Sequence, residues 1–301
     1  MSDNANNDIA TQVIALCKYV GVTPRLFEAL LHHFGSLERI IRADSGALMA
    51  IEQMSANIAN KITRTKRYFK ASDEFLTEMK RREIGVTTRF DPEYPSLLFE
   101  LNNPPPILYC RGRLPLGDKK TVALVGADKA TNEGMELTTT LAAAFARGEV
   151  QVVSSLDKGI SAAVHLGTRV EKGVSFAVLD CGLDELKPEE QARLAIDITH
   201  EGGLVSEYSP ETAPSSDNYK ALNRIIVGLS QAVVVTEIYK DSEHTLDLLK
   251  CCNQVGKLSF VIIDPRHGAL ADEASLNQAV SYGALPMVGL DKIDDIITAL
   301  V

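Results

Sequence analysis

The sequence predicts an α/β fold in which a mostly parallel sheet follows a small, all-helical N-terminal domain. Up to about residue 82 the apolar residues recur with helical spacing, whereas from Ile84 onward short apolar runs alternate with amphipathic segments. That alternation is typical of a parallel sheet covered by helices on both faces. A chain of 301 residues, 45% of them hydrophobic, is long enough for two domains, which we expect over residues 1–83 and 84–301.

The first domain is expected to consist of short helices. Ile9–Tyr19 has the spacing of a helix that Gly21 ends, and Pro24 stands where a second helix would begin. We expect that second helix to stop at Gly35. A long helix is then expected over roughly residues 56–82, because apolar residues recur along it at helical spacing.

The second domain is expected to begin with a β-rich run at Ile84–Phe90 and an extended stretch before Ile107. Further strands are expected at Val122–Val125, Val150–Ser154, Val174–Leu179, Gly203–Ser206, Ala232–Thr236 and Leu258–Ile263. The helices between them are expected at Met135–Arg147, Ser161–Lys172, Gln191–Thr199, Lys220–Leu229 and Thr245–Gln254.

The composition excludes several classes of protein. The cysteines are odd in number and lack CxxC spacing, so neither a disulfide framework nor a metal site is expected. Apolar runs stay far below the length of about 18–20 residues that a membrane span needs. The N-terminal residues lack the basic and apolar regions of a secretory signal, which predicts a cytoplasmic protein without a membrane partner.

The net charge of −9 is unevenly distributed along the chain. Residues 1–83 carry 12 basic and 10 acidic side chains, whereas residues 84–301 carry 19 and 30. Nucleic-acid-binding proteins usually display a basic patch, so DNA binding would need a local one here. The expected long helix carries a basic run from Lys61 to Lys70, which either extends a DNA-binding surface or is a solvated helix face.

The motifs predict no cofactor. In an open parallel sheet, ligands bind beyond the carboxyl ends of the strands, where helix N-termini offer free amides. The first turn of this kind, Val125–Gly134, lacks the GxGxxG spacing of dinucleotide-binding folds. A GxxxxGK[ST] phosphate loop is also absent, so we expect neither a nicotinamide or flavin nucleotide nor a nucleoside triphosphate.

Short motifs along the chain occur in an order that is shared with one known family. They are Tyr94-Pro95-x-x-Leu98, Pro105-Pro106-x-Leu108-Tyr109-x-x-Gly112, Val125-Gly126-x-x-x-Ala130-Thr131-x-x-Gly134, Ser154-x-Leu156-x-x-Gly159-Ile160, Leu204-x-Ser206-Glu207 and Asn223-Arg224-Ile225-Ile226-x-Gly228-Leu229-Ser230. With these motifs the chain resembles the DprA/Smf family of DNA-processing proteins over essentially its whole length. The resemblance implies an extended Rossmann-like domain joined to a SAM-like, helix-hairpin-helix-like domain. It also implies binding of single-stranded DNA without catalysis, a homodimer, and a RecA-type recombinase as protein partner.

The resemblance further implies a DNA- or anion-binding site at the strand ends. Its residues would be Gly126, Lys129, Thr131, Ser154, Lys158, Gly159, Tyr219, Lys220, Asn223 and Arg224. The cations among them would contact phosphates, and Tyr219 is the aromatic residue placed to stack on a base.

At this site the sequence departs from the family pattern in four places. Gly126–Asp128 replaces Gly-Ser-Arg, so a carboxylate stands where the family has a phosphate-facing cation. Ser154–Ser161 lacks one glycine and the closing aspartate, and Tyr219–Arg224 keeps only the last two polar residues. The turn Asp241–His244 is more acidic than the Ser-Gly-Ser of the family. These changes predict an altered pocket with a weaker hold on phosphate.

Several polar residues also have a structural explanation. His165 lies among small apolar residues of an expected helix, which favours a packed, hydrogen-bonded imidazole over a general base. Asn223 and Arg224 would start a helix, where they cap it, pair with Glu207 or Glu237, or bind the ligand. Since no nucleophile or metal-ligand set accompanies the glutamates, we do not expect an enzyme.

Two functions therefore remain open. The first is binding of single-stranded DNA in DNA processing, with an altered pocket. The second is a DprA-like antitoxin or scaffold that neutralises a phosphoribosyltransferase-like toxin in phage defence, which the acidic second domain favours. For either function we expect a homodimer, with the apolar segment Leu246–Cys252 as its candidate face.

Overall fold

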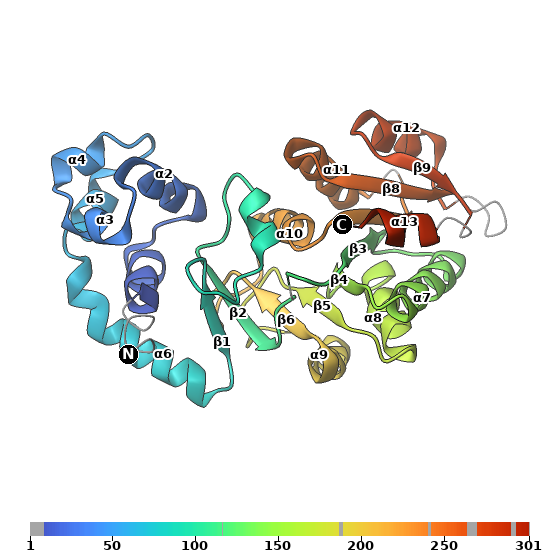
Figure 1. The fold of residues 1–301 in the computed structure, drawn as a ribbon, viewed down its shortest axis with the longest axis horizontal. Helices are drawn as coiled ribbons and strands as arrows, with labels where there is room; N and C mark the ends of the chain where they lie inside the picture. The colour runs from blue at the N-terminus through green and yellow to red at the C-terminus, as the bar shows by residue number, and fades with distance from the viewer. Residues whose placement is uncertain are drawn as a thin grey trace. The chain divides into compact units, whose positions relative to one another are not determined.

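The computed structural model describes residues 9–115, 117–186, 189–239, 242–263, 270–289 and 293–300. The chain divides into two compact units (Figure 1). The helical unit runs up to Tyr94 and includes Asn102–Tyr109, and the sheet unit comprises Pro95–Leu101 and the chain from Cys110 onward. Helix α6 (Phe69–Arg81) ends shortly before strand β1 (Gly85–Thr88), so the secondary structure changes where the hydrophobic period changes. The domain boundary between residues 83 and 84 stays a prediction.

Capping residues define the helices of the helical unit. These are η1 (Ala15–Val20), α2 (Pro24–Phe34), α3 (Leu37–Arg42), α4 (Ser45–Met49), α5 (Ala56–Ile62), η2 (Thr65–Tyr68) and α6. The side chain of Thr23 accepts a hydrogen bond from the backbone N–H of Leu26 and so caps α2, which begins at Pro24. Gly21 and Gly35 take the left-handed conformation at helix C-caps, so the predicted helix ends at these two residues are confirmed.

The prediction of a single helix over residues 56–82 is wrong. Helix α5 ends at Ile62, and the 3-10 turn η2 separates it from α6. The hydroxyl of Thr63 donates to the carbonyl oxygen of Asn60 at 2.9 Å, and that of Thr65 donates to the carbonyl oxygen of Ile62 at 2.7 Å. Such side-chain bonds compete with the helical hydrogen-bond ladder, and apolar periodicity does not record this competition.

The strands form a mostly parallel sheet, as predicted. Besides β1 they are β2 (Ile107–Gly112), β3 (Thr121–Gly126), β4 (Gln151–Ser155), β5 (Ser175–Val178), β6 (Gly203–Ser206), β7 (Ala232–Glu237), β8 (Leu258–Ile263) and β9 (Leu285–Val288). Their order in the sheet is β1-β2-β6-β5-β4-β3-β7-β8-β9. Each neighbouring pair in the part of this order from β6 through β3 to β9 is parallel. The six apolar runs predicted as strands from Val122 to Ile263 all lie in this parallel part.

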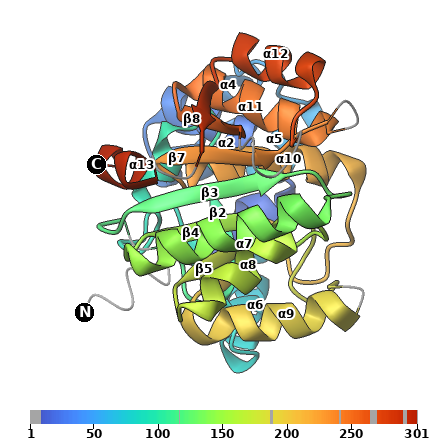
Figure 2. The ribbon, with the colours of Figure 1, turned by 90° about the vertical axis from the view of Figure 1, so that its right-hand side faces the viewer.

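Helices cover both faces of the parallel strands. They are α7 (Asn132–Arg147), α8 (Ile160–Val170), α9 (Glu189–Glu201), α10 (Ser216–Gly228), α11 (Glu243–Val255), α12 (Glu273–Ser281) and α13 (Ile293–Ala299), preceded by η3 (Ser96–Glu100). Val122, Leu124 and Val234 pack with α7, α8 and α13 in one buried cluster. Figure 2 shows α7, α8 and α9 in front of the sheet, while α10 packs on β4 and β5, and α11 on β8.

The chain reverses direction across the sheet between β3 and β7. From β3 it proceeds outward through β4, β5 and β6, and then returns to β7 on the other side of β3. In open α/β sheets, ligands bind in the crevice at the carboxyl ends of the two strands between which the strand order reverses, here β3 and β7. The register between β3 and β7 shifts at Gly126, which lies opposite Glu237.

The described elements η3, α12 and β9 are among those that were not predicted from the sequence. β9 is the last strand in the sheet order and contains Pro286. A proline cannot donate to a strand ladder and is tolerated at a sheet edge, so it weakens the strand signal in the sequence. Among the described residues no helix is long and apolar enough to cross a membrane.

The segment Leu246–Cys252 does not offer a spare apolar face. Leu246, Leu248, Leu249 and Cys252 are all buried within their own chain, on helix α11. The sequence pattern correctly marked an apolar helix face, but the sheet and its neighbouring helices already cover it. The predicted use of this segment as a dimer face is therefore wrong.

Candidate functional site

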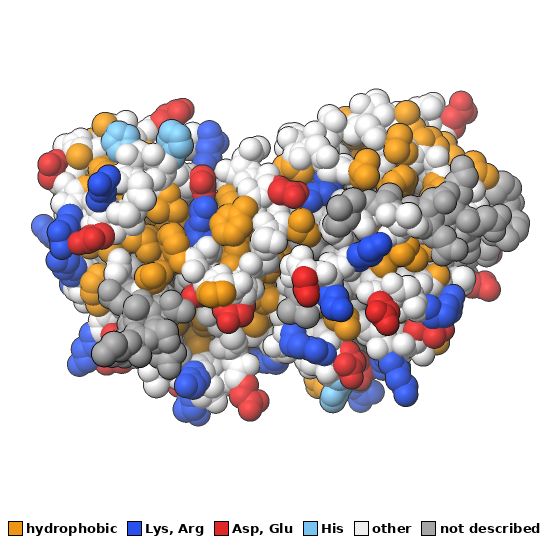
Figure 3. Space-filling model, viewed as in Figure 1, with side chains coloured by type: hydrophobic (Ala, Val, Ile, Leu, Met, Phe, Trp, Pro, Cys, Tyr) orange, Lys and Arg blue, Asp and Glu red, His pale blue; other side chains and the backbone are white. Residues whose placement is uncertain are grey.

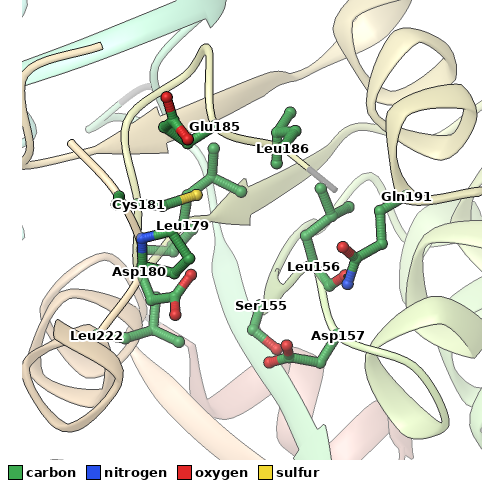
Figure 4. A pocket seen from close by; sticks show the side chains of 13 residues that line it. Ser155, Leu156, Asp157, Leu179, Asp180, Cys181, Glu185, Leu186, Gln191 and Leu222 are labelled. Carbon is green, nitrogen blue, oxygen red and sulfur yellow. The ribbon is translucent and has the colours of Figure 1, made fainter. Parts of the chain in front are cut away.

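A pocket of about 470 Å³ opens in the sheet unit at the carboxyl ends of β4 and β5. Its lining combines the ends of these strands and the turns that follow them with residues of α9 and α10. Figure 4 shows the carboxylates of Asp157 and Asp180 pointing into the space between them, with Leu156, Leu179 and Leu222 around it. The pocket thus combines an apolar lining with acidic groups.

Three carboxylates make this edge of the sheet acidic. Asp128 follows β3, Asp157 follows β4 and Asp180 follows β5. Partial burial, followed by the charge of Asp157, raises the pKa of the Asp128 and Asp180 carboxyls. Burial and then the charges of Asp157 and Asp128 likewise raise the pKa of the Tyr219 hydroxyl. The negative charge of Asp157 disfavours the ionised form of its neighbours, and the same charges would repel a phosphate.

Three of the predicted cations are exposed at the same edge. Lys129 lies in the turn between β3 and α7, Lys158 in the turn between β4 and α8, and Lys220 in α10. Tyr219 neighbours Lys220 and packs its ring edge-on against His244, with 4.1 Å between ring centroids. Lys158 directly follows Asp157 of the pocket lining, and the contact of the three lysines with DNA stays a prediction.

The N-terminus of α7 is occupied by an anion of the chain itself. Glu237 is fully buried at the end of β7, and its carboxylate accepts hydrogen bonds from the backbone N–H of Thr131 at 3.0 Å and from its hydroxyl at 2.7 Å. The hydroxyl of Tyr239 also donates to this carboxylate, at 2.8 Å. Gly134 makes room for it, because a Cβ there would lie 2.6 Å from Cδ of Glu237. Glu237 thus fills the place that a bound phosphate would take in this crevice.

Gly126 and Gly159 allow the first two turns of the edge to approach each other. A Cβ at Gly126 would lie 2.8 Å from the side chain of Ile160, the first residue of α8. Gly159 has φ of +70°, and its Cβ would lie 2.7 Å from the carbonyl oxygen of Ala127. Only glycine combines this conformation with this approach, so Gly159 holds Lys129 and Lys158 on adjoining turns.

Ser154 and His165 serve the core. The hydroxyl of Ser154 is buried and donates to the carbonyl oxygen of Leu124 at 2.7 Å. His165 is also buried, with Nε2 2.8 Å from the carbonyl oxygen of Ser155 and Nδ1 3.1 Å from the hydroxyl of Ser175. Burial lowers the pKa of the imidazole to about 4. The predicted packed and hydrogen-bonded histidine is confirmed.

Arg224 and Asn223 are held inside the chain. Arg224 forms an ion pair with Glu207, one of the alternatives that the sequence left open, and both side chains are largely buried. Glu237 is not its partner, because that carboxylate is bonded to Thr131 and Tyr239. The amide of Asn223 donates to the carbonyl oxygen of His244 at 3.1 Å.

The expectation that Asn223 and Arg224 start a helix is wrong. Helix α10 begins at Ser216, and the side chain of Ser215 caps it by accepting from the backbone N–H of Asn218. The buried apolar residues of α10 begin only at Leu222, and the first half of the helix is polar. The apolar pattern therefore predicted a helix start several residues too late.

Sequence reasoning missed Asp180 and Cys181 as members of the pocket. Their signal is positional, since they follow β5 as Asp128 follows β3. Burial and then the charge of Asp180 raise the pKa of the Cys181 thiol to about 12. Asp241, from the predicted acidic turn, lies outside the described residues. Across the part of the chain that is described, no group of three or more His, Cys, Asp or Glu side chains could hold a metal ion.

Comparison with protein families gives a match over most of the sheet unit. The model of the family described as DNA recombination-mediator protein A matches residues 85–299. Protein Smf of Synechocystis is 35% identical over 292 residues, which cover 91% of this chain and 73% of that protein. DNA processing protein DprA of Streptococcus pneumoniae is 31% identical over 172 residues, or 57% of this chain and 60% of that protein.

Solved structures of the same kind share the fold. The crystal structure of DNA processing protein A from Streptococcus pneumoniae superposes with a TM-score of 0.76 at 22% identity, covering 97% of this chain and 98% of that one. A structure of DNA processing protein A from Helicobacter pylori, a protein described as having a unique single-stranded DNA binding mode, gives a TM-score of 0.60 at 21% identity. It covers 72% of this chain and 95% of that chain.

Proposed function

Because this chain belongs to the DprA/Smf family, that of DNA recombination-mediator protein A, we propose that it binds single-stranded DNA in DNA processing and catalyses no reaction. Single-stranded DNA is the ligand described for the related Helicobacter pylori protein. The buried, hydrogen-bonded states of His165 and Glu237 support a binding rather than a catalytic site, since neither is available for acid–base work. A function on DNA implies a cytoplasmic location.

One observation carries the proposal: three exposed lysines lie in segments that follow the carboxyl ends of parallel strands. Lys129, Lys158 and Lys220 stand on two adjoining turns and on α10. A basic track with a neighbouring aromatic ring is how proteins bind single strands, and Tyr219 supplies the ring. Arg224 does not join this track, because its ion pair with Glu207 engages it inside the chain.

The pocket beside this track is altered toward acidity, and we include this in the proposal. Asp128, Asp157 and Asp180 surround the place where a phosphate would approach, and Glu237 already fills the N-terminus of α7. The DNA backbone is therefore expected to follow the lysines at the rim and to avoid the pocket itself. Binding should be weaker than that of a family member with an arginine at position 128.

The test is the salt dependence of oligo-dT binding, measured by fluorescence anisotropy. The double variant Lys129→Gln, Lys158→Gln should weaken binding and reduce the slope of log K against log salt by about 1.4, since each phosphate contact to a single strand contributes about 0.7. Its matched control is Lys119→Gln, Lys172→Gln, which removes the same charge from exposed positions outside this edge. Equal binding by the two double variants would refute the site.

A protein partner is the second candidate function, and the acidity of the pocket favours it. The carboxylates of Asp157, Asp180 and Glu185 in a partly apolar pocket suit a basic segment of another protein better than a phosphate backbone. The partner would be a phosphoribosyltransferase-like toxin held by a DprA-like antitoxin, or a RecA-type recombinase. Failure of the natural chain to bind oligo-dT at low salt would put this function first.

A homodimer forms part of the proposal through family membership alone, since Leu246–Cys252 is buried in its own chain. Light scattering over a range of micromolar concentrations is the direct test. A particle of 32.7 kDa at every concentration would show a monomer and exclude the dimer.

A further inference from the structure

The helical unit carries a basic segment where helix α5 gives way to α6. Its cations are Lys61, Arg64, Lys66, Arg67 and Lys70. The sequence has no acidic residue between Glu52 and Asp73, so nothing within the segment offsets this charge. The sheet unit, by contrast, places its three lysines beside three carboxylates. The basic segment therefore belongs to a different unit from the one that contains the pocket.

The break in the helix displays these side chains to solvent. Between Lys61 and Lys70 only Ile62 and Thr65 are buried, and Arg64, Lys66, Arg67 and Lys70 are exposed. The 3-10 turn η2 arises because Thr63 and Thr65 bond to preceding carbonyls. Figure 3 shows basic side chains gathered over this part of the helical unit, at the left edge of the view.

Few acidic groups engage these cations. Within the described ranges, the segment has a single ion pair, Lys70 with Glu74, at 3.8 Å and with both side chains exposed. No carboxylate of the described residues lies within ion-pair distance of Arg64, Lys66 or Arg67. Their charge is therefore available to an external anion, and its binding would release counterions.

Aromatic contacts hold the segment in place. The ring of Tyr68 stacks on that of Tyr19, with 5.6 Å between centroids and 9° between planes. The guanidinium of Arg67 lies over the Tyr68 ring, 4.6 Å from its centroid, and Tyr19 donates its hydroxyl to the carbonyl oxygen of Ala71 at 3.0 Å. The turn that carries the cations is thus fixed before any ligand binds, which reduces the entropy cost of binding.

We propose that the basic segment Lys61–Lys70 is a second site for the phosphate backbone of single-stranded DNA, independent of the lysines of the sheet unit. A membrane surface is disfavoured, because none of the large exposed apolar side chains among the described residues lies in this segment. The identity of the ligand rests on the proposed function, whereas the existence of a phosphate site rests on the segment itself.

The experiment removes three exposed charges and spares the Arg67–Tyr68 contact. The variant Arg64→Gln, Lys66→Gln, Lys70→Gln is compared with Arg25→Gln, Arg39→Gln, Lys80→Gln, which removes the same charge from exposed positions of the same unit. Fluorescence anisotropy of labelled oligo-dT is measured at several salt concentrations, with circular dichroism to verify the fold. We expect the segment variant to bind about 10- to 100-fold more weakly than the control variant, with a slope reduced by about 2.

Equal affinity and slope for the two triple variants would overturn the inference, because the effect would then be one of net charge. The inference would also be overturned if polyglutamate displaced labelled oligo-dT as efficiently as unlabelled oligo-dT does. The segment would then bind any polyanion, without preference for phosphate. The double variant Lys129→Gln, Lys158→Gln separates the two proposals. If it loses affinity while the segment variant matches its control, the proposed function stands and only this second site fails.

Discussion

Glu237 places its buried carboxylate on the backbone N–H of Thr131, 106 residues away in the chain and 3.0 Å away in the structure. The bond joins the end of β7 to the N-terminus of α7, at the point where the strand order reverses. The internal carboxylate there accepts from the backbone amide of the N-cap residue and lies in the positive field of the helix N-terminus, where a phosphate would otherwise be favoured. The N-terminus of α7 therefore already has an anion of the chain itself beside it.

The first prediction is that position 134 requires glycine because a side chain there would clash with the carboxylate of Glu237. Gly134→Ala should destabilise the natural chain by about 1–3 kcal/mol, because the added methyl group meets the carboxylate. In a Glu237→Ala background the same change should be neutral or stabilising by up to about 1 kcal/mol, as alanine is the better helix former. Urea unfolding followed by circular dichroism measures all four chains. An equal cost of Gly134→Ala in both backgrounds would show that the carboxylate is not the reason for the glycine.

The second prediction concerns the close approach at Gly159. Gly159 and Gly256 both have φ of +70°, but a Cβ at Gly256 meets nothing within 4 Å. Gly256→Ala should therefore cost only about 1–2 kcal/mol of backbone strain. Gly159→Ala should cost more, and it should also weaken oligo-dT binding because it separates the turns of Lys129 and Lys158. Thermal unfolding measures the stability of the two variants, and fluorescence anisotropy measures their binding of oligo-dT. An equal loss of stability in both variants would contradict the prediction.

The third prediction is a pH dependence of stability from His165. Its pKa is about 4 in the folded chain, against 6.5 for an ordinary histidine. Between these values the unfolded chain binds more protons, so the free energy of unfolding falls as the pH falls from 6.5 to 4, by about 3 kcal/mol in all. His165→Gln should remove this part of the dependence whatever its effect at pH 7. Urea unfolding at several pH values would contradict the assignment if both chains showed the same slope.

The fourth prediction addresses the acidic rim. A carboxylate about 4 Å from a phosphate repels it by about 1–4 kcal/mol, depending on how much solvent intervenes. Asp128→Arg should therefore strengthen oligo-dT binding and steepen its salt dependence. Asp118→Arg makes the same change of charge at an exposed position outside this edge and serves as the control. The altered pocket would be refuted if the natural chain bound oligo-dT tightly and Asp128→Arg left that affinity unchanged.

Most of the sheet unit could be predicted from the sequence. The run Leu258–Ile263 was predicted to the residue, because apolar side chains occupy five of its six positions. Prediction failed where the local pattern is mixed, as at the break after Ile62 and at the edge strand β9. In the first case threonine hydroxyls compete with the helix, and in the second a proline sits in a half-exposed strand.

The candidate site was predictable only in part. The sequence by itself determined which polar residues follow strands, and so it placed Lys129, Lys158 and Asp128 at one edge. Only the tertiary structure decided that Arg224 pairs with Glu207, while Thr131 binds Glu237. Hydrophobic periodicity records which face of each element is buried, since that depends on neighbours along the chain. The partner of Arg224 lies 17 positions away and that of Glu237 lies 106 positions away, and only the packing of the folded chain selects them.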